Sequence, residues 1–101
     1  MEKRNISHSL RGGKIYLIMV YDINEKRVNK VLKTARKYLN WIQNSVLEGE
    51  ISQANFTKLK FELKEIIEPT EDSIVFYIMR STRYTKREIM GMEKGGEETI
   101  I

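Results

Sequence analysis

The sequence contains no cysteine and only one histidine. Without cysteine the chain can form no disulfide, no zinc–thiolate site and no thiol nucleophile. The histidine, His8, lies in a polar segment before the first apolar run, so we expect no histidine general base. No apolar run is long enough to span a bilayer, and the first residues lack the apolar stretch of a signal peptide. These absences favour a cytoplasmic protein without a membrane partner.

Length and charge narrow the class of protein further. The 101 residues suffice for one domain with a thin core, and the sequence has no internal repeat. We divide it into a flexible N-terminal extension over residues 1–13, a folded domain over 14–94 and a loose tail over 95–101. Lysine and arginine number 18 against 14 aspartates and glutamates, which gives a formal net charge of +4. This mild excess favours an acidic partner, of which nucleic acid is the commonest.

Hydrophobic patterning predicts a strand, a helix and two short strands in the first half of the chain. Residues 14–22 are apolar on both alternating faces, which is typical of a central strand covered on at least one side. Asn24 follows and can cap a helix. Apolar side chains then recur at helical spacing, at Val28, Val31, Leu32, Ala35 and Leu39. Short strands are expected near residues 41–43 and 46–51, separated by a bend.

The second half of the chain predicts another helix and a further strand. Ser52 can cap this helix, Pro69 ends it, and residues 73–80 follow as a strand. Its apolar face comprises Phe56, Leu59, Leu63, Ile66 and Ile67. The order strand, helix, strand, strand, helix, strand predicts a ferredoxin-like α+β fold, with both helices on one face of an antiparallel sheet. Residues 87–92 are a candidate for an additional short strand.

Positive charge is concentrated on one face of the first predicted helix. Only Glu25 opposes it locally. A row of cations can neutralise the phosphates of a nucleic acid, whereas the alternative is an ordinary solvated helix face. The one-sided charge favours nucleic-acid binding. The residues concerned are a row at Lys26, Lys30, Lys33 and Lys37, flanked by Arg27 and Arg36.

A second basic cluster follows the last predicted strand of the sheet. Arginine and tyrosine together suit contact with a phosphate backbone and stacking on bases, but a flexible surface loop is an equally good interpretation. Neither basic cluster has a base-reading signature, so we expect recognition of shape and phosphate without sequence preference. The residues of this second cluster are Arg80, Arg83, Tyr84, Lys86 and Arg87.

Tyr21 and Asp22 stand at the end of the first strand. Mg²⁺ prefers oxygen ligands, and a second copy across a twofold axis would supply a second carboxylate beside Asp22. Such an ion would polarise a phosphate and lower the pKa of an attacking water. The alternative, which the pattern alone favours, is that Asp22 starts the turn before the helix. Tyr21 can position a phosphate or a water, although a strand tyrosine more often packs.

Two segments carry a resemblance to a known family. The first is IYLIMVYD at residues 15–22, and the second is YLNWIQNSVLEGEI at residues 38–51, after the basic helix. Together they resemble the small CRISPR-associated adaptation protein, the non-integrase subunit of the spacer-acquisition complex, from about Ile15 to about Met92. The resemblance implies a ferredoxin-like domain that forms a homodimer through its sheet. It also implies that a short strand near Glu88–Met92 pairs with the partner protomer.

The same resemblance implies partners and an activity. Members of the family bridge two copies of the CRISPR integrase and lie along the duplex DNA that is inserted. Several are reported to cut RNA or DNA with magnesium, and the family aspartate that matches Asp22 is the metal ligand proposed for them. We therefore take Asp22 and Tyr21 as catalytic candidates, Mg²⁺ at the dimer axis as the cofactor, and single-stranded RNA or duplex DNA as substrate. The sequence departs from the family at Leu47, where a phenylalanine tied to nuclease activity is common.

A ferredoxin-like RNA-binding or regulatory module unrelated to CRISPR is the alternative. An RNA-recognition motif needs aromatic side chains at fixed places on its two central strands. The predicted strand at residues 46–51 has no aromatic residue, which argues against that class.

Overall fold

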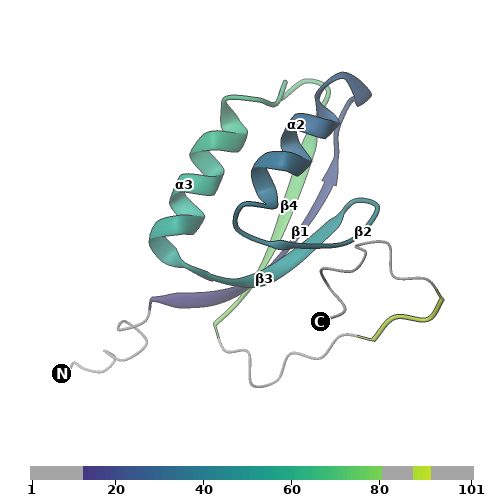
Figure 1. Ribbon diagram of the computed structural model, residues 1–101. Coiled ribbons are helices and arrows are strands. Elements are labelled where there is room, and N and C mark those ends of the chain that lie inside the picture. Colours follow the sequence, from purple (N-terminus) through teal and green to yellow (C-terminus); the bar gives the residue numbers. More distant parts are fainter. Residues whose placement is uncertain (1–12, 81–87, 92–101) are drawn as a thin grey trace.

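A computed structural model describes residues 13–80 and 88–91 of the chain. In these residues two helices cover one face of a four-stranded sheet (Figure 1). The elements in chain order are β1 (Lys14–Asp22), α2 (Glu25–Ala35), β2 (Asn40–Gln43), β3 (Val46–Ser52), α3 (Gln53–Lys64) and β4 (Ser73–Met79). The strand order is β2-β3-β1-β4, and each neighbouring pair is antiparallel. This is the ferredoxin-like α+β fold that the sequence predicts.

Both helices begin at the predicted caps. The side chain of Asn24 accepts a hydrogen bond from Lys26 N at 2.9 Å, and Ser52 Oγ accepts one from Asn55 N at 3.0 Å. Each bond satisfies a backbone donor that the first helical turn leaves unpaired.

The ends of the helices differ from the prediction. The expectation that Pro69 ends the second helix is wrong, because α3 already ends at Lys64. After Lys64, Ile66 N donates to the Leu63 carbonyl at 2.9 Å across three residues, which is a tighter turn than an α-helix, and Ile67 N donates to the same carbonyl at 3.0 Å. The two isoleucines still pack against the core from this turn. Apolar spacing therefore identified buried residues correctly and placed the helix end too late.

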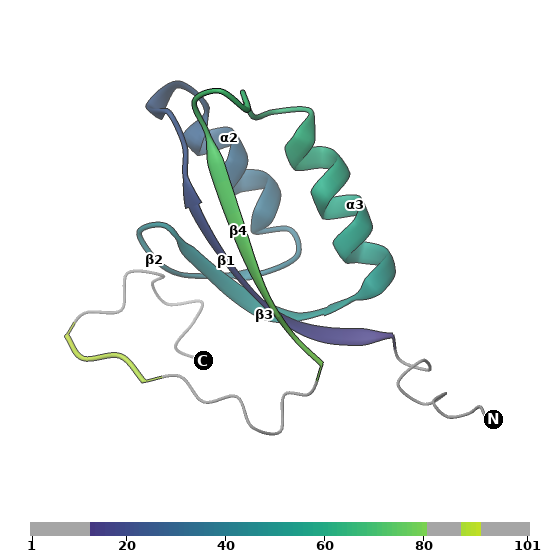
Figure 2. The same ribbon diagram turned by 180° about the vertical axis from the view of Figure 1, so that it is seen from behind.

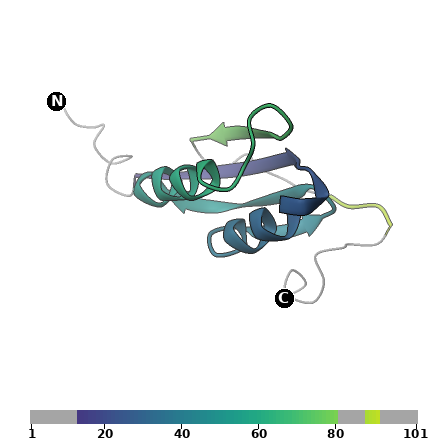
Figure 3. The ribbon, with the colours of Figure 1, turned by 90° about the horizontal axis from the view of Figure 1, so that it is seen from above.

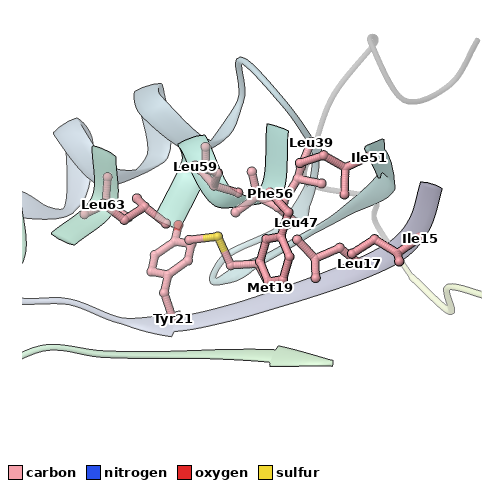
Figure 4. Packing of buried hydrophobic residues seen from close by; sticks show 12 residues of the cluster. Ile15, Leu17, Met19, Tyr21, Leu39, Leu47, Ile51, Phe56, Leu59 and Leu63 are labelled. Atoms are coloured by element: carbon pink, nitrogen blue, oxygen red, sulfur yellow. The ribbon is translucent and has the colours of Figure 1, made fainter. Parts of the chain in front are cut away.

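The core lies between the sheet and the helices (Figure 4). Successive residues of a strand point to opposite faces, so every second residue of β1 faces the helices. Leu17 and Met19, at the middle of the strand, have no exposed surface, and Leu59 from α3 is equally buried. Full burial of one such side chain stabilises the fold by about 2 kcal/mol. The buried cluster comprises Ile15, Leu17, Met19, Tyr21, Val31, Ala35, Leu39, Leu47, Ile51, Phe56, Leu59 and Leu63.

The opposite face of the sheet carries apolar side chains that no described helix covers. β4 passes in front of α2 when the molecule is seen from behind (Figure 2), and β1 lies between β4 and α2 when the molecule is seen from above (Figure 3). Tyr77 and Val75 are 58% and 44% exposed. We call this surface the open sheet face. Its apolar members are Ile18 and Val20 from β1, Val46 from β3, and Val75 and Tyr77 from β4.

The predicted boundaries and the predicted last strand are only partly within the described residues. Glu88–Gly91 form no strand in the single chain, and Met92 lies outside the described residues, so pairing with a partner protomer stays a prediction. Gly13, which we assigned to the extension, already belongs to the fold, because its carbonyl accepts a hydrogen bond from Gln53 N at 2.7 Å. Residues 1–12 and the tail over 95–101 are outside the described part of the chain. Within residues 13–80 and 88–91, neither helix has the length and apolar character needed to cross a bilayer.

Candidate functional site

The two catalytic candidates at the end of β1 point to opposite sides of the sheet. Asp22 is exposed and pairs with Ser73 of β4, on the side of Ile18 and Val20. Tyr21 is buried on the helix side, and its hydroxyl donates to the Asn44 carbonyl at 2.8 Å. Burial raises the pKa of the Tyr21 phenol, which keeps its proton. The Tyr21 side chain therefore packs in the core with its hydroxyl on the Asn44 carbonyl, and its catalytic role stays a prediction.

The donor chemistry of Asp22 suits Mg²⁺, because a carboxylate is a hard oxygen ligand. Among the described residues no three histidine, aspartate or glutamate side chains gather into a group that could hold a metal. Two acids of the turn before β4, Glu71 and Asp72, lie next to Ser73, which pairs with Asp22, but both are already bound to Arg27. At this strand end, the part of the chain that the structure describes thus offers a single carboxylate for an ion. The remaining ligands would have to be water, substrate phosphate or the same residue of a second copy.

Asp72 lies behind this strand end, in the turn before β4. Its side chain is fully buried, and its Oδ1 accepts a hydrogen bond from Asn24 N at 2.8 Å. Its Oδ2 accepts bonds from Glu68 N at 2.8 Å and from the Arg27 Nε at 2.6 Å. We call these groups, together with Glu71, the Asp72 cluster. It joins the loop after β1, the first turn of α2 and the turn before β4 through one carboxylate.

Arg27 therefore has an internal role that the sequence did not reveal. A guanidinium nitrogen also donates to Glu71 Oε1 at 2.7 Å, and the arginine side chain is 19% exposed. Hydrogen bonds to both acids raise the pKa of Arg27, and the guanidinium holds the pKa of the Asp72 carboxyl far below its usual range. The prediction assigned Arg27 to the nucleic-acid surface. The pairing of β4 with β1 brings the acidic turn to the start of α2, and this pairing is not visible in helix periodicity.

The predicted lysine row also contains both exposed residues and one that binds an acid of the fold. Lys26, Lys30 and Lys33 are exposed along α2. Lys37 lies past the end of the helix, where its ammonium binds Glu62 of α3 at 2.6 Å. Tyr38 donates to the other carboxylate oxygen of Glu62 at 2.8 Å.

The flanking arginines of the predicted nucleic-acid surface also differ in their surroundings. The guanidinium carbon of Arg36 lies 5.6 Å from the centre of the Trp41 ring, within the range of a cation–π contact. Arg80 follows β4 and is exposed. Arg83 and Arg87 lie outside the described residues, so the second basic cluster stays a prediction.

Comparison with known proteins now decides the family. A family model described as CRISPR associated protein Cas2 matches residues 15–87. The chain belongs to the Cas2 family. Proteins named CRISPR-associated endoribonuclease Cas2 from Dictyoglomus turgidum and Thermotoga maritima are 61% and 57% identical to it over 87 residues. Each match covers 86% of this chain and 100% of the relative.

A solved Cas2 structure agrees with this assignment. The structure titled "Crystal structure of cas2" superposes with a TM-score of 0.74 at 41% sequence identity, and the match covers 87% of this chain and 99% of that one. The resemblance drawn from the segments at residues 15–22 and 38–51 is confirmed. The alternative of a module unrelated to CRISPR is set aside.

The departure from the family at Leu47 concerns a core position in this Cas2 fold. Leu47 has no exposed surface and stands opposite Met19 in the register of β3 and β1. Its side chain therefore fills the space between sheet and helices and does not face a substrate.

The Asp72 cluster predicts a specific pH dependence of stability. Because the folded-state pKa of Asp72 is lowered, its ionised form stabilises the fold at pH values above about 4, the ordinary range of an aspartate. This contribution is lost as the pH falls from there towards the folded-state pKa. We expect urea midpoints of the wild type to exceed those of Asp72→Asn at pH 7, with a difference that shrinks below about pH 4. A difference that stays constant down to pH 3 would contradict the role of the charge.

Proposed function

We propose that this Cas2-family chain acts as a homodimer in CRISPR spacer acquisition. In this role it bridges integrase subunits in the cytoplasm and binds duplex DNA without sequence preference. We propose in addition that the dimer cleaves nucleic acid in a magnesium-dependent reaction at Asp22. The observation that carries the proposal is the open sheet face, which presents exposed apolar side chains and Asp22 on the same side of β1.

The chemistry of that face supports the proposed dimer. Exposed apolar side chains that adjoin one another are typical of interaction surfaces. A twofold interface uses the same patch on both partners, so each copy can cover the apolar strip of the other. Asp22 lies at the end of that strip, beyond Val20. Two copies docked in this way would carry two carboxylates towards one axis.

Binding of duplex DNA is supported by the charge on the helix side. Lys26, Lys30 and Lys33 are exposed and lie on successive turns of α2. Lysines spaced along one helix can follow a phosphate backbone and displace its counterions. The row contains no arginine fork or amide arranged to read base edges, which is the basis for expecting no sequence preference.

The nuclease activity rests on the carboxylates of Asp22. In the proposed dimer these two side chains would hold Mg²⁺. The bound ion would polarise a substrate phosphate and lower the pKa of a bound water. The chain's own contribution is to hold the Asp22 carboxylate exposed at the end of β1. The relatives' name of endoribonuclease supports RNA as the first substrate to test.

The dimer predicts a sensitive position at Tyr77. Replacing Tyr77 with aspartate puts a charge into the proposed apolar interface, and burial of an unpaired charge is costly. We expect Tyr77→Asp to be monomeric by light scattering at concentrations where the wild type is dimeric. The control Phe61→Asp changes an equally exposed aromatic on α3 and should remain dimeric. A wild type that is strictly monomeric would remove the basis of the proposal.

The metal site predicts that Asp22→Ala abolishes magnesium-dependent cleavage while duplex binding survives. Cleavage of single-stranded RNA and of duplex DNA is measured with magnesium and with EDTA, and binding by fluorescence anisotropy. Glu25→Ala removes an exposed acid three residues away and should cleave as the wild type does. Full activity of Asp22→Ala would exclude Asp22 from the site, and cleavage that persists in EDTA would exclude the metal.

The lysine row predicts a change in salt dependence. The double variant Lys30→Ala with Lys33→Ala should bind every duplex sequence more weakly. The slope of log K against log salt should fall by about 2, since each lost phosphate contact removes about 0.9. The matched control Lys58→Ala with Lys64→Ala makes the same charge change on α3 and should keep the wild-type slope. Equal losses in both double variants would indicate a general effect of net charge.

A further inference from the structure

The end of β1 is held from two sides. Asp22 pairs with Ser73 across the β1–β4 ladder, and the neighbouring residue Asp72 accepts the hydrogen bond from Asn24 N. The three residues from Asp22 to Asn24 are thus fixed at their first member by the sheet and at their last by a buried carboxylate. Strand ends otherwise fray, because their last backbone groups have few partners.

The Asp72 carboxylate is itself rigidly held. It accepts from the Glu68 backbone N–H, from the Arg27 Nε at 2.6 Å, and from an Arg27 terminal nitrogen at 3.2 Å. Arg27 in turn is fixed by α2, and its terminal nitrogen reaches Glu71. Bonds from a charged donor are stronger than neutral ones, and a bidentate arginine also fixes the orientation of the carboxylate.

We propose that Asp72 is a positioning residue for the metal-binding carboxylate of Asp22. This inference rests on the proposed magnesium site. One carboxylate per chain binds an ion weakly, so any conformational freedom of the ligand lowers affinity further. By fixing the backbone over residues 22–24, the Asp72 cluster holds Asp22 at one place on the open sheet face. Groups that orient a metal ligand typically change metal affinity by tenfold or more.

A general stabilising role would give a different pattern, and Glu62 offers the matched comparison. Glu62 also joins two elements through a carboxylate, since it binds Lys37 and Tyr38. Its partners follow the C-terminal end of α2, whereas the Asp72 cluster lies at the N-terminal end of that helix. If Asp72 only stabilised the fold, Asp72→Asn and Glu62→Gln would affect the Asp22 site alike.

The experiment measures binding of Mn²⁺ alone, by the electron paramagnetic resonance signal of the free ion, together with amide hydrogen exchange. We expect Asp72→Asn to bind Mn²⁺ about tenfold more weakly than the wild type, and Glu62→Gln to bind it equally well. In the Asp22→Ala background, adding Asp72→Asn should change nothing further. The Asn24 amide should exchange faster in Asp72→Asn and at the wild-type rate in Glu62→Gln.

Arg27→Gln provides a second variant in case Asp72→Asn fails to fold. It removes the charged partner and leaves the two backbone bonds of Asp72, so a smaller loss of Mn²⁺ affinity is expected. Wild-type affinity in both variants, with an intact Asp22-dependent site, would overturn the positioning role and leave the proposed function standing. Equal losses in the Asp72 and Glu62 variants would also overturn it. A wild type without Asp22-dependent Mn²⁺ binding would overturn the proposed metal site and this inference together.

Discussion

The pleat of β1 is the constraint on which the rest of the structure depends. Because successive side chains alternate between faces, Leu17 and Met19 enter the core while Ile18 and Val20 must lie on the other side. The two helices cover Leu17 and Met19 and remove them from water. Ile18 and Val20 stay on the open sheet face. One strand therefore builds the domain and also supplies the surface on which the proposed dimer relies, with Asp22 as its last residue.

Two buried or half-buried carboxylates fasten the helix layer at its ends. Asp72 ties the N-terminal turn of α2 to the turn before β4, and Glu62 ties the segment after α2 to α3. Each takes its cation from the basic residues of the first helix region. Similar basic side chains therefore have different roles. Arg27 and Lys37 form ion pairs within the fold, whereas the surface lysines are Lys26, Lys30 and Lys33.

Family membership and geometry support the same functional picture from independent directions. A Cas2 family member with an exposed apolar sheet face has a physical reason to pair with itself. The proposed pairing would double both the carboxylate at the strand end and the lysines on the helix side. The proposed bridging of integrase subunits and the proposed cleavage each use features that are insufficient in one copy.

The sequence alone determined the order of elements, both helix caps, the buried positions and the family, because strand alternation, helical spacing and capping are local in the chain. The end of α3 at Lys64, five residues before Pro69, was not visible in the apolar spacing. Only the tertiary structure decided the roles of the polar residues. In the sequence Arg27 is one more cation beside a basic row. In the fold β4 pairs with β1, and this pairing places Asp72 beside Arg27. A charge at a given helical position looks the same in sequence whether water or a carboxylate from a distant segment faces it. The roles of these residues could therefore be assigned only from the folded structure.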